Sequence, residues 1–140
     1  MTHGGILDLE FAFLCDSAQE SGGKIHALGI GFDSIAAPSV PVTHPMLSVV
    51  AQIRYSVAEA GQKALAIRAI DADGGNIVNP IDGQVEFPVP LKGSTSIARL
   101  IIALGGVNFA SYGDYAVHIA LNGNEVARLP LTVVPVQSNP

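Results

Sequence analysis

The sequence predicts an all-β protein, a two-sheet antiparallel β-sandwich of seven to eight strands with an immunoglobulin-like or jelly-roll-like arrangement. Along most of the chain, apolar residues alternate with small or polar ones, which is typical of strands with one buried face. Turn residues separate these stretches at the spacing of about 8–12 residues that marks such folds. Helical periodicity is nearly absent. We expect one domain over residues 1–140, because a chain of this length buries one substantial core.

The first third of the chain contains two predicted strands. Residues 7–15 alternate strictly, and residues 24–35 alternate after a glycine-containing turn. Residues 36–45 contain three prolines and are predicted to be an irregular crossing between the sheets. The residues expected to point inward are Leu7, Leu9, Phe11, Phe13, Cys15, Leu28, Ile30 and Phe32.

Four further stretches alternate in the middle of the chain. Residues 47–57 and 63–71 are predicted as strands joined by a short turn, and residues 97–104 as a later strand. Residues 85–91 alternate with prolines at outward positions, and because proline donates no ladder hydrogen bond we expect this strand at a sheet edge. The inward residues are Leu47, Val49, Ala51, Ile53, Tyr55, Val57, Leu65, Ile67, Ala69, Val85, Phe87, Val89 and Leu91.

The clearest hairpin lies in residues 113–134, where Asn122-Gly123 separates two alternating arms. Asn-Gly is the strongest signal for a two-residue turn, but that register would place Val117 opposite Arg128. A three-residue loop with Asn124 in a left-handed conformation instead gathers the apolar side chains on one face, and burial decides register. The expected pairs are Tyr115 with Leu131, Val117 with Leu129 and Ile119 with Ala127.

The entrance to this hairpin carries a structural signal. In immunoglobulin-like sandwiches a tyrosine near a strand entrance closes the corner through its hydroxyl, and Tyr115 is placed for that role. The alternative is that Tyr115 is simply a core aromatic. A tight entrance favours a positive φ, which glycine adopts without strain, so we expect one at Gly113.

Several short motifs of turn and core residues are spread over most of the chain. They are Ala12-Phe13-Leu14-Cys15-Asp16-Ser17-Ala18, Gly23-Lys24-Ile25, Leu28-Gly29, Phe32-Asp33, Pro41-x-x-His44-Pro45, Gly113-Asp114-Tyr115 and Leu129-Pro130-Leu131. This pattern resembles a family of small bacterial β-sandwich proteins of unknown function. The resemblance implies the fold and supplies no catalytic residues.

Composition argues against several classes of function. The net charge is −5 and the seven basic residues are scattered singly, which is unlike the basic stripe of a nucleic-acid-binding protein. No apolar run approaches the ~20 residues of a membrane-spanning helix. The first residues lack a basic segment, Asp8 and Glu10 interrupt the apolar ones, and Cys15 is the single cysteine. We therefore expect a cytoplasmic protein without a secretory signal or an internal disulfide.

One turn, residues 71–76 (DADGGN), supplies a weak calcium candidate consisting of Asp71, Asp73, Asn76 and Asp82. An EF-hand loop ends in a bidentate glutamate at its twelfth position, where this sequence has the shorter Asp82. Aspartate and glycine are also what a hairpin turn favours. We expect a turn that binds no metal, and no cofactor elsewhere.

Candidates for catalysis are equally few. His3, His26, His44 and His118 are far apart in the sequence, and His118 is expected on an outward face, in solvent or at an interface. Cys15 lies in an apolar run, where a small buried residue is its usual role. No nucleophile elbow, phosphate-cradling glycine loop or HExxH motif is present. The sequence therefore predicts that the protein is not an enzyme.

The outward faces of the predicted strands are short of charge. Only 14% of residues are charged, against about 25% in an average globular chain. Outward alanine, glycine and isoleucine suggest a face covered by another subunit. The interface candidates are Ala64, Ala66, Ile97, Ile101, Ala116, His118 and Ala120.

These observations lead to three hypotheses. The favoured one is a non-enzymatic structural or assembly subunit that self-associates into a homo-oligomer or a filament. The alternative is a sandwich module that binds a ligand or a partner protein through its end loops. The third is an enzyme whose site carries no sequence motif.

Overall fold

The computed structural model describes residues 7–136 and confirms an all-β fold. These residues form ten strands, more than the seven or eight predicted, and one short 3-10 turn. The strands are β1 (Leu7–Cys15), β2 (Ser17–Ser21), β3 (Lys24–Leu28), β4 (Ser34–Ala37), β5 (Val42–Ser56), β6 (Gly61–Asp71), β7 (Ile81–Phe87), β8 (Thr95–Phe109), β9 (Gly113–Leu121) and β10 (Asn124–Pro135), and the turn is η1 (Val57–Glu59).

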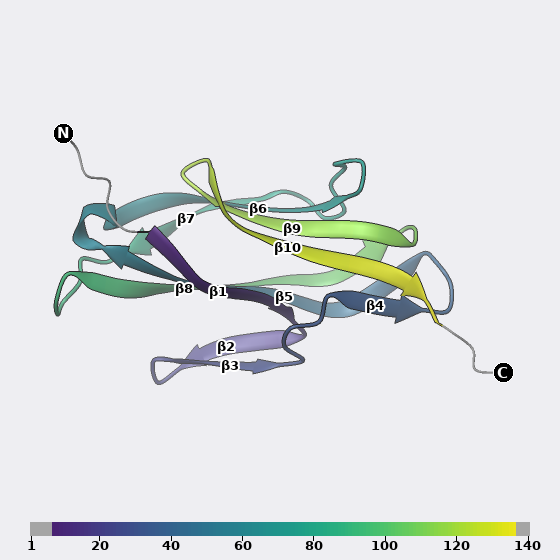
Figure 1. Ribbon diagram of the computed structural model, residues 1–140, viewed down its shortest axis with the longest axis horizontal. Helices are drawn as coiled ribbons and strands as arrows, with labels where there is room; N and C mark the ends of the chain where they lie inside the picture. Colours follow the sequence, from purple (N-terminus) through teal and green to yellow (C-terminus); the bar gives the residue numbers. More distant parts are fainter. Residues whose placement is uncertain (1–6, 137–140) are drawn as a thin grey trace.

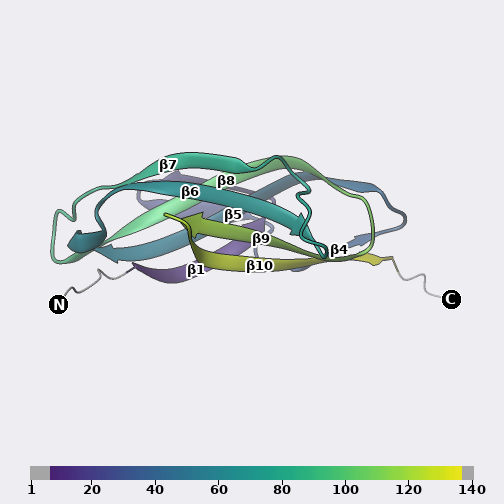
Figure 2. The same cartoon turned by 90° about the horizontal axis from the view of Figure 1, so that it is seen from above.

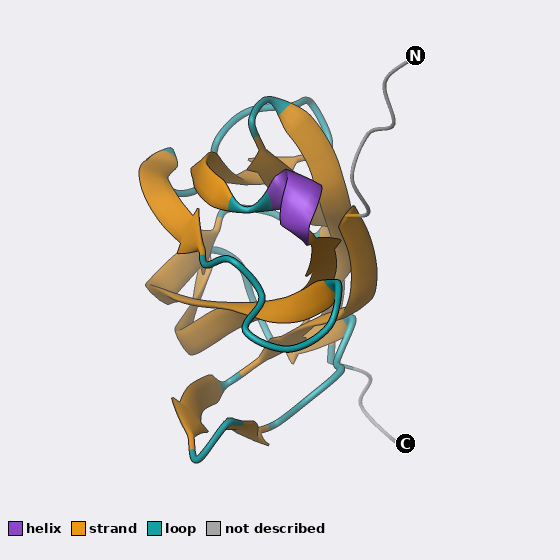
Figure 3. Cartoon of the chain, turned by 90° about the vertical axis from the view of Figure 1, so that its left-hand side faces the viewer, coloured by secondary structure: helices purple, strands orange, loops and turns teal. Residues whose placement is uncertain are grey.

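Two sheets face each other across the core, and a hairpin forms a third layer (Figure 1). The larger sheet has the strand order β4-β10-β9-β6-β7, and the smaller one has the order β1-β5-β8. β2 and β3 pair with each other and lie on the outer side of the smaller sheet, as the end-on view shows (Figure 3). Among the described strands, β4 and β10 pair in parallel, which differs from the wholly antiparallel prediction.

The core lies between the two sheets and is built from alternating residues. β5 buries Leu47, Val49, Ala51, Ile53 and Tyr55, and β6 buries Leu65, Ile67 and Ala69, as predicted. Aromatic pairs fill it toward opposite ends of β8: Tyr55 and Phe87 have ring centroids 4.7 Å apart, and Phe109 meets Tyr115 edge-on at 4.9 Å. Full burial of one such side chain stabilises the fold by about 1.5–3 kcal/mol.

β1 has the predicted bounds, but its predicted inward face holds only before Glu10, where Leu7 packs against the core. A bulge between Leu9 and Phe11 inserts Glu10, and one extra residue reverses the alternation beyond it. Leu14 therefore faces the core, whereas Phe11 and Phe13 stack on the outer side of the sheet with centroids 5.9 Å apart.

The predicted second strand is divided, and its faces are reversed. β3 ends at Leu28, because Gly29 and Gly31 both have positive φ values of 68° and 81°. Leu28 and Ile30 are 71% and 58% exposed rather than buried, while Phe32 packs against the core as expected. The predicted irregular crossing is also shorter, since β4 and β5 occupy both of its ends.

The predicted edge strand is at the edge of the larger sheet, but its bounds differ. β7 begins at Ile81 and ends at Phe87, since Pro88 begins an irregular segment in which Val89 and Leu91 are exposed. Val57 is likewise exposed, in η1. β8 extends past the predicted end, through Gly105 with a φ of 74°, and buries Val107 and Phe109.

The β9–β10 hairpin satisfies both of the conflicting sequence signals. All three predicted pairs, Tyr115–Leu131, Val117–Leu129 and Ile119–Ala127, are present. The loop is nevertheless a two-residue turn, with positive φ at Asn122 (50°) and Gly123 (81°) and not at Asn124. A bulge between Glu125 and Ala127 restores the register that buries the apolar residues.

The entrance to β9 has the expected corner. Gly113 has a φ of 131°, in the region that favours glycine. The Tyr115 hydroxyl donates a hydrogen bond to the carbonyl oxygen of Ser111 at 2.6 Å, while its ring lies in the core. The connection from β8 to β9 is thereby fixed to the body of the sandwich.

Candidate functional site

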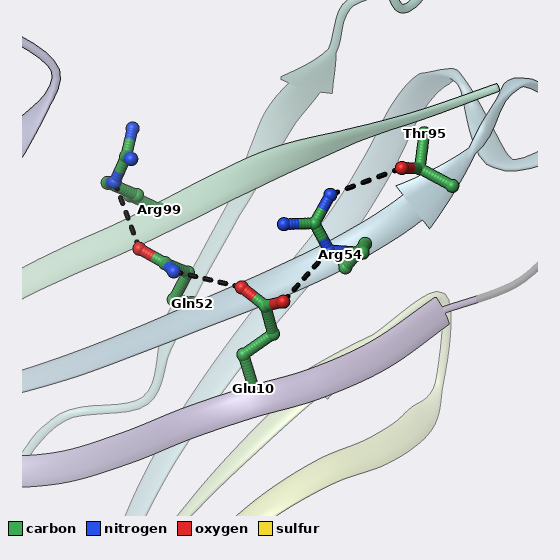
Figure 4. Close-up of polar contacts among 5 residues, drawn as sticks. All are labelled: Glu10, Gln52, Arg54, Thr95 and Arg99. Atoms are coloured by element: carbon green, nitrogen blue, oxygen red, sulfur yellow. Dashed lines mark hydrogen bonds and ion pairs between the residues drawn. The ribbon is translucent and has the colours of Figure 1, made fainter. Parts of the chain in front are cut away.

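A chain of polar contacts crosses the outer side of the smaller sheet (Figure 4). Glu10, which alternation from the inward Leu9 already places on this side, accepts hydrogen bonds from Gln52 Nε2 at 2.9 Å and from Arg54 Nε at 2.8 Å. Arg54 also donates to the Thr95 hydroxyl at 3.1 Å, and Arg99 donates to Gln52 Oε1 at 3.0 Å. The contacts therefore link all three strands of the sheet.

The electrostatics of these polar contacts follow from the two arginines, Arg54 and Arg99. The hydrogen bond from Arg54, followed by the one from Gln52, lowers the pKa of Glu10 below its ordinary value. Glu10 is therefore ionised at neutral pH and acts as a hydrogen-bond acceptor rather than an acid. The arrangement is suited to joining strands, since its one carboxylate, that of Glu10, is paired with the Arg54 guanidinium.

The β2–β3 hairpin is fastened to this same side of the sheet. Glu20 of β2 forms an ion pair with Arg99 of β8 at 3.0 Å. On the sheet, Cys15 lies opposite Ser48 on the outer face, and Cys15 and Val50 are fully buried. Burial, followed by the charge of Asp16, raises the pKa of the Cys15 thiol, which disfavours the nucleophilic thiolate.

The base of the hairpin gathers residues from four of the sequence motifs. Asp16 Oδ1 lies 3.5 Å from His44 Nε2, and the His44 ring packs on Phe32 with centroids 5.6 Å apart. A Cβ atom on Gly29 would come within 2.4 Å of Asp16 Oδ2. Glycine is thus required there both for its φ and for the space that the carboxylate occupies.

Five of the seven interface candidates share the outer face of the larger sheet, which no described segment crosses (Figure 2). Ala64, Ala66, Ala116, His118 and Ala120 lie side by side on β6 and β9, with Ala66 paired to Ala120 and Arg68 paired to His118. Ala116 is already buried by its neighbours, whereas Ala64 is exposed. The remaining residues on this face include charges of both signs.

Charged side chains flank the small residues on this face. Arg68 of β6 reaches Asp82 of β7 at 2.9 Å, and His118 of β9 forms an ion pair with Glu125 of β10. The face is also hollowed: a shallow pocket of about 400 Å³ is lined by Ala64, Leu65, Ala66, Asp82, Gly83, Gln84 and Gly123.

The other two candidates, Ile97 and Ile101, lie on the opposite side of the molecule. They are half-buried on β8, on the outer face of the smaller sheet, where they pair with Arg54 and Val50. The seven candidates therefore form two separate surfaces rather than one.

The calcium candidates are not brought together. The Asp71 carboxylate accepts hydrogen bonds from the backbone amides of Asp73 and Gly75, both at 2.9 Å, and so closes the turn. Asp82 instead lies on the sheet face, opposite Ala66 in the strand pairing. Its carboxylate forms an ion pair with Arg68. Among the described residues, no three histidine, cysteine or acidic side chains are grouped as metal ligands.

The histidines are likewise separate. His26 contacts the carbonyl oxygen of Ser21 at 3.3 Å, within the β2–β3 hairpin. His44 lies at the hairpin base and His118 on the larger sheet, and His3 lies outside the described residues. The ring Nε2 atoms of His44 and His118 are buried without a hydrogen-bond partner in the part of the chain that is described.

Sequence reasoning missed the Glu10–Gln52–Arg54–Arg99 contacts. The four residues come from three strands that are far apart in the chain, and alternation within a strand does not show which strands lie side by side. A usable signal is that Gln52 and Arg54 are alternate residues on one outward face of an otherwise apolar strand.

The fold and these surfaces define an all-β sandwich with a hairpin third layer. The model of a family described only as a family of unknown function, DUF6941, matches residues 10–134, and the chain belongs to that family. No curated protein matches it. In the described part of the chain, no helix has the length and apolar character needed to cross a membrane.

Proposed function

We propose that this protein is a non-enzymatic structural subunit, acting in the bacterial cytoplasm, that assembles with copies of itself. The observation that carries the proposal is the outer face of the five-stranded sheet. Its centre holds Ala64, Ala66 and Ala120 where a solvated sheet normally has polar side chains. Small residues on this face allow a second sheet to approach closely.

The test is the oligomeric state of the purified protein. We expect sedimentation velocity at micromolar concentration to show a species larger than the monomer. Ala66→Glu and Ala120→Glu should weaken that association without unfolding the subunit, because each puts a long side chain where small residues allow a second sheet to approach closely. Ala72→Glu is the matched control, since Ala72 is exposed in the turn after β6. A wild-type protein that sediments as a monomer would rule out the proposal.

A second candidate function has its own supporting observation. The loops at one end of the sandwich expose Val57, Val89 and Leu91, with Leu91 100% exposed, and a backbone hydrogen bond from Val57 to Ser94 at 3.2 Å joins the two loops. Neighbouring exposed apolar residues often mark a binding site for another protein. If the wild type is monomeric, this surface is tested by capturing binding proteins on the immobilised wild type. Val89→Asp and Leu91→Asp should then no longer retain the protein that the wild type binds.

A further inference from the structure

We infer that a second copy of the chain packs against the outer face of the five-stranded sheet and forms a two-fold dimer. The two-fold axis runs across the strands and passes between the positions of Ala120 and His118 on β9. The inference rests on the proposed self-association and names its surface and geometry. It is carried by the charges, the shape and the pairing register of that face.

The first observation is that the charges lie in two adjacent rows. Strand pairing aligns Glu125, Ala120, Ala66 and Asp82 in one row across the sheet. The next row consists of Arg128, His118 and Arg68. One row is therefore acidic at both ends, and the neighbouring row is basic. The two rows are separated by two residues, or about 7 Å, along β6 and β9.

The second observation is that the rows beyond these differ in size. On the acidic side, Ala64 pairs with Gln84 and lies beside Gly123, and these residues line the pocket of about 400 Å³. On the basic side, Ile70 pairs with Ala116, which pairs with Pro130. The face thus has a hollow half and a filled half.

A two-fold axis between the charged rows places the acidic row of one copy over the basic row of the other, and the hollow half of one copy over the filled half of the other. Rotation about that axis keeps each strand over its own copy and reverses its direction. Arg128 then faces Glu125 of the second copy, and Ile70 faces the hollow beside Ala64. The same contacts occur twice, as an isologous interface requires.

The spacing of packed sheets is compatible with these contacts. Two sheets pack about 10 Å apart with their strands within about 30° of each other. Rotation by that angle about the sheet normal displaces groups least near the centre of the face, and Glu125 and Arg128 lie on β10, next to the central strand β9. Side chains as long as arginine and glutamate span the separation.

Arg128 is the residue on which the arrangement depends most. Arg68 and His118 already have acidic partners in their own subunit, Asp82 and Glu125. Arg128 is exposed and has no ion pair within residues 7–136. A second copy supplies Glu125 as its partner, and complementary charges of this kind select one orientation over others.

Charge reversal tests the geometry. We expect Arg128→Glu and Glu125→Arg each to raise the dimer dissociation constant by about tenfold or more, because like charges then face each other. The double variant exchanges the two charges and should return the constant to within about threefold of wild type. Denaturation midpoints of all variants establish that the subunit stays folded.

The outcomes separate this inference from the proposed function. A monomeric wild type rejects both. A self-associating wild type that tolerates either single reversal, or whose double variant is as weak as the single ones, rejects the two-fold arrangement and leaves self-association in place. As an independent check, Ala64→Leu fills the hollow and should weaken the dimer, whereas Ala36→Leu, at an exposed position on β4, should not.

Discussion

Glu10 is a residue of the smaller sheet whose pKa is lowered by its neighbours. Its pKa is lower in the folded protein than in the unfolded chain, chiefly through the hydrogen bond from Arg54. Its contribution to stability is therefore present above the unfolded pKa and is lost as the pH falls through the folded pKa. The acid side of the stability profile thus carries a contribution from this contact.

The prediction is that Arg54→Met raises the pKa of Glu10. Carbon-13 NMR titration of the Glu10 carboxyl measures it directly, and the variant should also lose less stability than wild type between neutral and acid pH. Arg68→Met is the matched control, because Arg68 pairs with Asp82 on the opposite sheet. Equal titration of Glu10 in wild type and Arg54→Met would contradict the assignment.

Gly113 illustrates a constraint that is purely conformational. A Cβ atom there would meet nothing within 4 Å, so only the φ of 131° opposes a side chain. We predict that Gly113→Ala lowers the free energy of unfolding by about 1–3 kcal/mol. Gly83→Ala is the matched control, since its Cβ also enters open space and its φ is not in the positive region. Urea denaturation compares the two, and equal midpoints would disprove the strain.

Single residues also mark the limit of prediction from sequence. The buried face of β5 followed from alternation, because the strand pairs with β8 without a register shift from Ser48 to Ser56. In β1 the same reasoning failed after Glu10, since one bulged residue exchanges the two faces. Alternation predicts which face a residue is on only as far as the next bulge. Whether the backbone forms a bulge at Glu10 depends on its pairing with β5, which is far away in the chain.

At the scale of elements, the β2–β3 hairpin is the part that sequence reasoning described least well. A continuous strand from Lys24 was expected, but Gly29 and Gly31 redirect the chain to β4 and leave Leu28 exposed. A two-stranded hairpin is marginal by itself. Its position therefore depends on contacts such as the pair between Glu20 and Arg99.

The hairpin gives a prediction about Cys15. Gly29→Ala forces a Cβ against Asp16 and strains a positive φ, so the hairpin base should loosen. We expect the Cys15 thiol, fully buried in the wild type, to react faster with a thiol reagent in this variant. Gly31→Ala is the control, because its φ is also positive but its Cβ meets nothing within 4 Å. Equal reaction rates in both variants would show that the hairpin does not protect the thiol.

At the scale of the whole molecule, the fold class could be predicted and the function could not. Alternation, turn spacing and edge prolines are local signals, and they give an all-β sandwich. The separation of Ile97 and Ile101 from the alanines of β6 and β9 depends on which sheet each strand joins. Local periodicity contains no information about that choice.

Self-association also leads to a thermodynamic prediction. Because assembly stabilises the folded state by mass action, Tm should depend on protein concentration. We expect a rise of about 2–4 °C for each tenfold increase, measured by calorimetry. Ala66→Glu should have a Tm that is independent of concentration over the same range, and an equally independent wild type would contradict the prediction.

The parallel pairing of β4 with β10 has a consequence for how the chain is made. Ile35 pairs with Val133, and Ser34 pairs with Thr132. A strand from the first third of the chain therefore has its pairing partner in the last described strand. Until β10 has left the ribosome, the larger sheet lacks both strands at one edge, because among the described strands β4 pairs only with β10. Contacts so distant in sequence also form slowly. The larger sheet is therefore completed only after β10 has been synthesised and has emerged, and until then the growing chain presents open strands to its surroundings.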